Sequence, residues 1–127
     1  MTLAATDTID LILLTRDRRT LKLVIVATEN LTDGPQVNQL RNKLLSYRDA
    51  IRSGKFNEIY PQYAALRKMI QVDHYSPLGA QAEQVLTECA REFRSDSLSV
   101  VSNQCSANPL RIVLNLFRGG QSREWTA

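Results

Sequence analysis

The sequence has few of the residues that build metal sites and disulfide frameworks. Its 127 residues include two cysteines, Cys89 and Cys105, and one histidine, His74. Two cysteines are too few for a disulfide framework, and they fit a reducing compartment. One histidine with scattered carboxylates lacks the ligand spacing of a zinc site. We therefore predict no metal site, no cofactor and no disulfide-stabilised fold.

Glycine-rich loops and long apolar segments are also missing. The five glycines include one adjacent pair, Gly119-Gly120, and no Gly-Lys-Ser/Thr run follows it, which argues against a phosphate-binding loop. No stretch approaches the roughly 18 apolar residues of a membrane span. The first seven residues lack the basic start and apolar centre of a signal peptide. We expect a soluble, cytoplasmic protein without a membrane partner.

The overall composition is that of an ordinary globular chain. Hydrophobic residues make up 43% of the sequence and charged residues 23%, both near globular averages. The length suits one domain with one core, so we predict that residues 1–127 form a single domain. The net charge of +3 is sufficient for solubility but is a weak nucleic-acid signature. Charge therefore does not favour nucleic acid as a partner.

The N-terminal part of the chain predicts a β-hairpin that is apolar on both faces. From Thr8 to Thr28, two apolar runs flank the polar segment Arg16 to Arg19. With the tip at Asp17-Arg18, Ile12 faces Leu23 and Leu14 faces Leu21. The other face then carries Ile9, Leu11, Leu13, Lys22, Val24 and Val26. A hairpin with one solvated face would be polar at every second position, so we expect helices on one face and a helix or second subunit on the other.

The next segment predicts the first helix. Pro35 suits a first helical turn, and Ser53-Gly54 provides a stop. Between them, apolar residues recur at spacings of three and four, which is one face of a helix. These residues are Val37, Leu40, Leu44, Tyr47 and Ile51. The following segment, Lys55 to Pro61, is expected to be a turn or irregular link that places Phe56, Ile59 and Tyr60 on the core.

The second half of the chain predicts three strands and a second helix. A strand is expected at Leu66 to Tyr75, and Ser76-Pro77 is a start signal for a helix that runs to about Arg94. The buried side of that helix is Leu78, Ala82, Val85, Leu86, Cys89 and Phe93. Strands are expected at Leu98 to Ser102 and Leu110 to Phe117, and residues 119–127 are expected to form a flexible tail.

The order β-β-α-β-α-β-β places the chain in the α+β class. We predict a mixed or antiparallel sheet of four to five strands with two main helices packed on it. If both helices lie on the same face, the other face is bare, and large bare apolar faces mark partner surfaces. This pattern favours a homodimer, with an unidentified protein partner as the alternative.

Four residues are candidates for a ligand pocket: Asp10, Tyr60, Asp73 and His74. Asp10 lies between apolar strand residues, so its carboxylate must be held by backbone donors or an arginine, or contact a ligand. Asp73 cannot orient His74 as a triad acid would, because neighbouring strand residues point to opposite faces. We assign no catalytic residue, and we lean towards a protein that is not an enzyme. A small-molecule site or minor enzyme requires these four residues to converge in one cavity.

Basic residues gather in two places. Arg16, Arg18 and Arg19 crowd the hairpin tip. The other group forms one stripe beside the apolar face of the first helix and consists of Arg41, Arg48, Arg52 and Lys55. Such a stripe is commonly a solvated border whose stems cover the core edge, and phosphate or acidic-partner binding is the alternative. The aromatic platforms that bind single-stranded nucleic acid are missing here.

Four short segments together carry a family resemblance: Asp7-Thr8-Ile9-Asp10, Ser53-Gly54, Ile59-Tyr60-Pro61 and Ile70-Gln71-Val72. Over about Asp7 to Ser102 the chain resembles a family of small bacterial proteins of unknown function. The resemblance implies a cytosolic bacterial α+β domain and brings no catalytic residues with it. Our leading hypothesis is a non-catalytic protein-interaction or regulatory domain that acts as a homodimer. A small-molecule site ranks second, and nucleic-acid or phosphate binding ranks third.

Overall fold

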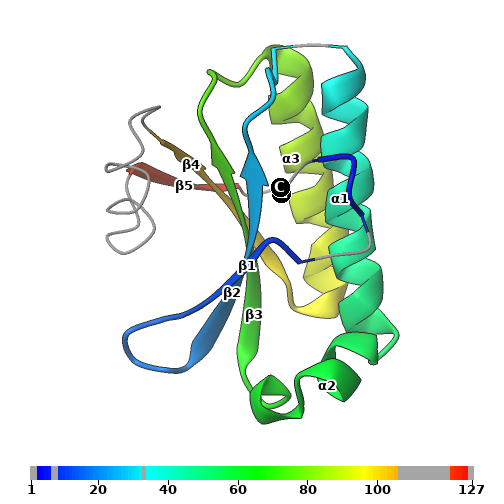
Figure 1. Ribbon diagram of the computed structural model, residues 1–127, viewed down its shortest axis with the longest axis vertical. Helices are drawn as coiled ribbons and strands as arrows, with labels where there is room; N and C mark the ends of the chain where they lie inside the picture. The colour runs from blue at the N-terminus through cyan, green and yellow to red at the C-terminus, as the bar shows by residue number, and fades with distance from the viewer. Residues whose placement is uncertain (1–2, 7–8, 33, 106–120, 126–127) are drawn as a thin grey trace.

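The computed structural model describes residues 3–6, 9–32, 34–105 and 121–125. Within them, five strands form one sheet, and two long helices pack against it (Figure 1). The strands are β1 (Leu11–Leu14), β2 (Thr20–Ala27), β3 (Arg67–His74), β4 (Ser99–Gln104) and β5 (Gln121–Trp125). The helices are α1 (Pro35–Arg52), the short α2 (Lys55–Ile59) and α3 (Ala80–Phe93), with 3-10 turns η1 (Pro61–Tyr63) and η2 (Arg94–Asp96). The fold is α+β with a mixed sheet, as predicted.

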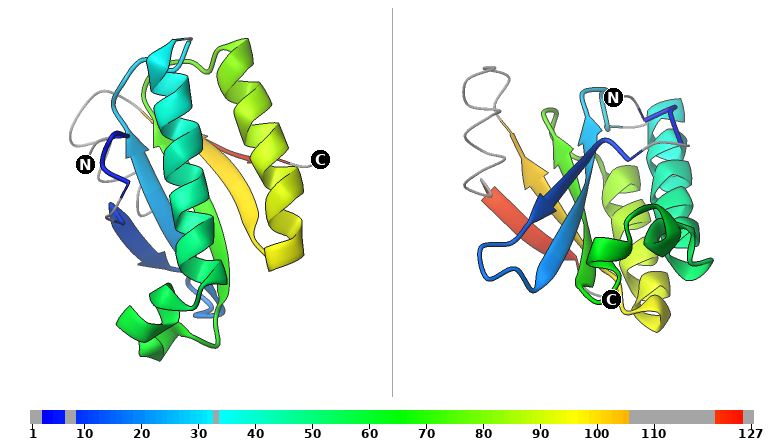
Figure 2. Two further views of the ribbon diagram at one scale, coloured as in Figure 1. Left: turned by 90° about the vertical axis from the view of Figure 1, so that its right-hand side faces the viewer. Right: turned by 60° about the horizontal axis from the view of Figure 1, so that its bottom comes forward.

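The strands follow one another across the sheet in sequence order, β1-β2-β3-β4-β5. β2, β3 and β4 are parallel, while β1 and β5 are antiparallel to their neighbours. The hairpin has the predicted register, with Ile12 opposite Leu23 and Leu14 opposite Leu21. Both helical crossovers advance in the same direction through the sheet, and right-handed crossovers of this kind place their helices on one face. α1 and α3 accordingly lie side by side on the same face (Figure 2).

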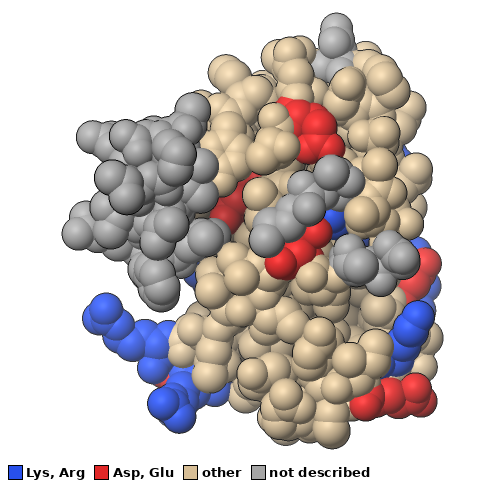
Figure 3. All heavy atoms as spheres, in the orientation of Figure 1, with Lys and Arg blue, Asp and Glu red and all other residues tan. Residues whose placement is uncertain are grey.

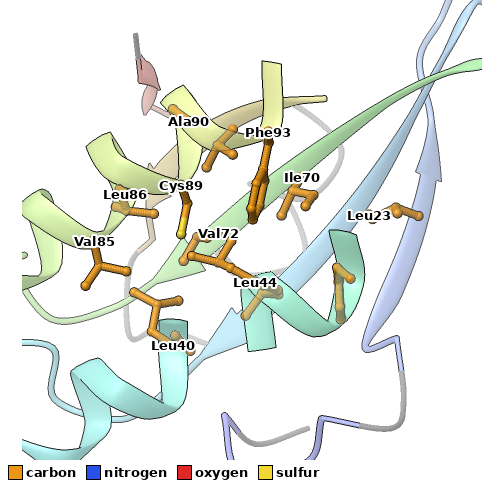
Figure 4. Close-up of a cluster of buried hydrophobic side chains, with 14 of the residues drawn as sticks. Leu23, Leu40, Leu44, Ile70, Val72, Val85, Leu86, Cys89, Ala90 and Phe93 are labelled. Carbon is orange, nitrogen blue, oxygen red and sulfur yellow. The ribbon is translucent and has the colours of Figure 1, made fainter. Parts of the chain in front are cut away.

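The core fills the space between this face and the two helices (Figure 4). Alternate residues of β2 and β3 contribute Leu21, Leu23, Ile25, Ala27, Ile70 and Val72. The predicted apolar stripes of α1 and α3 pack against them with Val37, Leu40, Leu44, Tyr47, Val85, Leu86, Cys89 and Phe93. Strand side chains alternate between faces, so the other half of the strand residues point away from both helices. We call that second surface the helix-free face.

The segment after α1 is more ordered than the predicted irregular link. Gly54 separates α1 from α2 by adopting a left-handed conformation with a φ of 84°. Phe56 is buried and Tyr60 packs partly against the core, as predicted. Ile59, however, is 58% exposed, so its predicted place in the core is wrong. A helix of five residues turns one side towards the core, and Phe56 occupies that side.

The second helix begins later than predicted. α3 starts at Ala80 with Gly79 as its N-cap, not at Ser76-Pro77. The Gly79 backbone N–H donates to the Leu31 carbonyl at 3.1 Å, and a Cβ at Gly79 would lie 1.9 Å from the Thr32 carbonyl oxygen. This close approach requires glycine. The Ser76 hydroxyl caps no helix and instead accepts a hydrogen bond from the Leu31 N–H at 3.1 Å.

The C-terminal part of the chain also differs from prediction. The predicted strand at Leu110 to Phe117 lies outside the described residues. β5 falls within residues 119–127, the segment that was predicted to be a flexible tail. β5 pairs with β4, with Gln121 opposite Gln104 and Trp125 opposite Val100. The pairing uses backbone groups, and the polar composition of this segment therefore did not indicate it.

Candidate functional site

The structure separates the four residues that were predicted to share a ligand pocket. Asp10 reaches α1 on the helix-covered face, and His74 lies on the same face, opposite Ala27 of the core. Asp73 points to the helix-free face because it is the strand neighbour of His74. Tyr60 follows α2 and lines a groove to which the other three do not contribute. The four residues therefore do not converge in one cavity.

Asp10 is held by a buried cation and by backbone groups. Its Oδ1 lies 2.7 Å from the Lys43 Nζ, and both side chains are at most 1% exposed. Its Oδ2 accepts from the Val26 N–H at 2.9 Å. The Asp10 N–H donates to the Tyr47 hydroxyl at 3.0 Å, and that hydroxyl donates to the Val24 carbonyl at 3.4 Å. This network joins the start of β1 to β2 and α1, and it makes Asp10 a structural carboxylate.

Sequence reasoning missed Lys43, although a signal for it exists. Lys43 lies three residues after Leu40 and four before Tyr47, which places it on the buried stripe of α1. A lysine on such a stripe is buried only when it is paired. Backbone donors or an arginine were the expected partners of Asp10; the structure has a backbone donor from Val26, and the charged partner is a lysine instead of an arginine.

His74 lies at the carboxyl end of β3, the sheet edge at which parallel sheets usually bind ligands. Ligands in open α/β sheets bind beyond the carboxyl ends of the parallel strands. Here His74 is 3% exposed, and its Nδ1 lies 2.7 Å from the Ser76 carbonyl, to which it donates. The Ser76 and Gly79 contacts to Leu31 join the connection after β3 to the one after β2. These hydrogen bonds hold the two connections together beyond the carboxyl ends of β2 and β3.

Asp73 belongs to a buried polar cluster on the helix-free face. Its Oδ1 accepts from the Gln71 Nε2 at 2.7 Å and from the Asn103 Nδ2 at 3.2 Å. Among the described residues, no hydrogen-bond donor reaches three buried oxygens of this cluster: Asp73 Oδ2, Gln71 Oε1 and Asn103 Oδ1. Desolvation raises the pKa of Asp73, and the two amide hydrogen bonds oppose that shift in part. The cluster is therefore rich in acceptors and short of donors.

The predicted arginine stripe is a set of ion pairs between helices. Arg41 lies 2.7 Å from Glu88, Arg48 lies 3.9 Å from Glu92, and Arg52 lies 2.8 Å from Asp96. The three acids are spaced four residues apart along α3 and η2, facing the arginines of α1. Lys55 does not belong to this helix, because it begins α2. The acidic partners neutralise the stripe, which makes it a poor phosphate-binding surface.

The hairpin tip, by contrast, keeps its positive charge. Arg16, Arg18 and Arg19 are exposed, and basic side chains protrude at the lower left of Figure 3, where Figure 1 shows the β1–β2 turn. Asp17 shapes the turn by accepting from the Thr15 hydroxyl at 2.7 Å and from the Arg19 N–H at 3.0 Å. Arg67 of β3 joins the tip, since its N–H donates to the Arg19 carbonyl. Only the parallel pairing of β2 with β3 reveals this fourth arginine.

The hairpin also forms one end of the sheet. Among the described residues, β1 pairs with β2 and has no strand on its other side. The helix-free face of the hairpin carries Leu11, Leu13, Lys22, Val24 and Val26. Val24 is fully buried, whereas Leu11, Leu13 and Val26 are half-buried. Leu14, at the end of β1, is 42% exposed. The hairpin thus presents an apolar edge strand.

A groove lies between α1, α2 and the N-terminal segment, which here means residues 3–6 together with Ile9. Its volume is about 930 Å³, and Ile9, Tyr47, Phe56, Ile59 and Tyr60 contribute to its walls. The Phe56 and Tyr60 rings pack with centroids 5.0 Å apart. We call this feature the α1–α2 groove. Sequence reasoning placed Tyr60 in a pocket, but it missed the groove itself because three separate segments form it.

The described residues show no metal site, and their thiols are buried. No group of three or more His, Cys, Asp or Glu side chains within the described ranges could hold a metal ion. Cys89 and Cys105 are both buried, as predicted for Cys89, and burial raises the pKa of Cys89 to about 11. In the part of the chain that the structure describes, no helix is long and apolar enough to cross a membrane.

The chain matches no family model, no curated protein and no solved structure. The resemblance to small bacterial proteins of unknown function, and the cytoplasmic location that it implies, stay predictions.

Proposed function

We propose that this protein is a non-catalytic interaction domain that pairs with a second copy of itself through the β1–β2 hairpin. The observation that carries the proposal is the composition of β1, whose four residues Leu11–Leu14 are all apolar although the strand lies at the sheet edge. Edge strands of monomeric proteins are protected by charged residues, proline or bulges, because their free backbone groups pair readily with other strands. β1 has no charged residue and no proline.

A second copy is the partner that suits this edge best. Two identical strands that pair in antiparallel orientation are related by a two-fold axis, so each backbone donor finds its acceptor on the other copy. In such a dimer, Leu11 and Leu13 of each copy extend one apolar surface over the helix-free face. The pairing would also cover Leu14, which is otherwise exposed.

The mass of the protein in solution tests the proposal. We expect sedimentation equilibrium at micromolar concentration to give twice the mass of one chain. Leu13→Glu should dissociate the dimer, because it removes an apolar side chain worth about 1.5–3 kcal/mol, or roughly tenfold or more in the dissociation constant. Leu13 lies opposite Lys22, so the new glutamate gains a cross-strand partner and the hairpin should still fold.

Two further variants make the result specific. Leu14→Glu changes an exposed residue of the same strand and should also give monomers. Ile59→Glu introduces the same charge at a more exposed apolar residue on α2, and it should leave the dimer intact. A wild-type protein that stays monomeric at every concentration would overturn the proposal. A dimer that dissociates with Ile59→Glu but not with Leu13→Glu would place the interface elsewhere and would also contradict it.

A further inference from the structure

The α1–α2 groove has the size and shape of a small-molecule site. Its volume of about 930 Å³ lies within the range of roughly 300–1,000 Å³ that is typical of ligand pockets. It lies between α1 and α2, beside the N-terminal segment that crosses in front of α1 in Figure 1. The Ser46 hydroxyl donates to the Thr6 carbonyl and joins that segment to α1. The groove therefore has three walls that are tied together.

One wall of the groove is apolar and partly open to solvent. Ile59 is 58% exposed, which makes it the most exposed large hydrophobic side chain among the described residues. On the same short helix, Phe56 is buried, and its ring packs against the Tyr60 ring. Ile9 and Leu45 complete the apolar surface from the N-terminal segment and from α1. An aliphatic or aromatic body of a ligand would remove these side chains from water.

The rim of the groove is polar and leaves one positive charge unbalanced. One side of α1 and its C-cap contributes polar residues at spacings of three and four: Asn42, Ser46, Asp49 and Ser53. The Asp49 carboxylate is paired with Arg48 at 3.0 Å. Lys55 lies at the same rim, and it forms no ion pair within residues 3–6, 9–32, 34–105 and 121–125. The groove thus offers a cation above an apolar wall.

We propose that the α1–α2 groove binds a small apolar anion, with a hydrocarbon or aromatic body against Phe56, Ile59 and Tyr60 and a carboxylate at Lys55. The charge of Lys55 selects an acidic head group, while the apolar wall accounts for most of the affinity because an exposed ion pair contributes little. This site is separate from the dimer edge at β1. It goes beyond the proposed function, and neither proposal depends on the other.

Titration with defined probes tests this proposal. Anilinonaphthalene sulfonate, an apolar fluorophore with one negative charge, should bind with a rise in fluorescence, and decanoate and naphthoate should displace it. Decanol, which has the same chain without the charge, should displace it about five times less effectively than decanoate. The two carboxylates distinguish a chain-shaped site from a ring-shaped one. Amide chemical shifts in the presence of decanoate should change at Ile9, Phe56 and Tyr60.

Matched variants connect the binding to the groove. Ile59→Glu, at an exposed residue, should reduce affinity for decanoate by about tenfold or more. Lys55→Gln should reduce it by about fivefold and remove the preference for decanoate over decanol. Arg18→Gln removes the same charge at the hairpin tip and should have no effect. Failure of all three probes to bind the folded wild-type protein, or shift changes confined to the helix-free face, would overturn the proposal.

Discussion

Two buried carboxylates on opposite faces of the sheet show how differently one fold treats the same chemical group. Asp10 and Asp73 both have essentially no exposed side-chain surface. On the helix-covered face, each oxygen of Asp10 has a donor, and one of these donors is the ammonium group of Lys43. On the helix-free face, the part of the chain that the structure describes supplies no donor to Asp73 Oδ2 or to two neighbouring amide oxygens.

The difference follows from which elements cover each face. α1 carries a long side chain that can bring a positive charge to the start of β1, and the backbone of β2 supplies a second donor. Around Asp73 the described partners are side-chain amides. Each side-chain amide that donates through its NH2 group also brings a carbonyl oxygen that itself needs a donor. Each amide that donates to Asp73 therefore leaves one more acceptor to satisfy. A buried carboxylate stabilises the fold only where the donors match the acceptors.

The largest expected effect comes from breaking the Asp10 pair. Lys43→Met should destabilise the protein by about 3–5 kcal/mol, because it leaves an unpaired carboxylate in the interior. Urea unfolding followed by circular dichroism measures this loss. Arg41→Met is the matched control. Arg41 is on the same helix as Lys43, but its ion pair with Glu88 of α3 lies at the surface, so the loss should be at most about 1 kcal/mol.

A double variant distinguishes the effect of the unpaired Asp10 charge from the effect of changed side-chain packing. In the double variant Asp10→Leu and Lys43→Met, no charge is left buried, so the protein should recover part of the stability that Lys43→Met loses. Equal destabilisation by Lys43→Met and Arg41→Met would show that the buried Asp10–Lys43 ion pair contributes no more to the free energy of unfolding than a surface pair does.

The opposite result is expected at Asp73. Asp73→Asn should stabilise the protein at neutral pH by about 1–3 kcal/mol, because it removes a buried charge and supplies an NH2 donor to the unpaired oxygens. The folded-state pKa of Asp73 is raised above its unfolded value. Its contribution is therefore most favourable below the unfolded pKa of about 3.9 and is lost as pH rises through the folded pKa.

Unfolding of wild type and Asp73→Asn over a pH series measures this dependence. The advantage of the variant should be greatest at neutral pH and should shrink as the pH falls, reaching its minimum below the unfolded pKa of about 3.9, where the wild-type carboxyl group is protonated in both states. Asp96→Asn is a useful control, since the Arg52 hydrogen bond lowers the pKa of Asp96. Its pH dependence should have the opposite sign. A variant at Asp73 that is less stable than wild type at neutral pH would contradict our description of the cluster.

The smallest effect is expected at Tyr47, which supports Asp10 without carrying charge. Tyr47→Phe keeps the ring in the core but removes the hydroxyl that bonds the Asp10 N–H and the Val24 carbonyl. We expect a loss of about 1 kcal/mol, the usual net value of one or two hydrogen bonds. Thermal unfolding measured by calorimetry would detect it. A loss as large as that of Lys43→Met would mean that the hydroxyl, not the ion pair, dominates this network.

The sequence by itself determined strands β1 to β4, helix α1, most of helix α3 and the helix-covered core. The alternation of apolar residues gave the hairpin register from Ile12 to Leu23, and spacings of three and four gave the buried side of α1. These signals are local, because the period of a strand or helix decides which side chains share a face. The wrong predictions include the start of α3. Gly79 replaced Ser76 as the cap of α3, since a glycine was needed next to Thr32.

The tertiary structure alone decided which candidate site residues meet. Asp10 pairs with Lys43 of α1, which is 33 residues away in the sequence. Arg67 joins the hairpin tip through strand pairing, and acidic residues of α3 and η2 neutralise the arginine stripe of α1. β5 pairs with β4 through its backbone, which composition does not encode. In each case the partner comes from a distant part of the chain. Local periodicity fixes the direction of a side chain, but only the packing of elements fixes what that side chain meets.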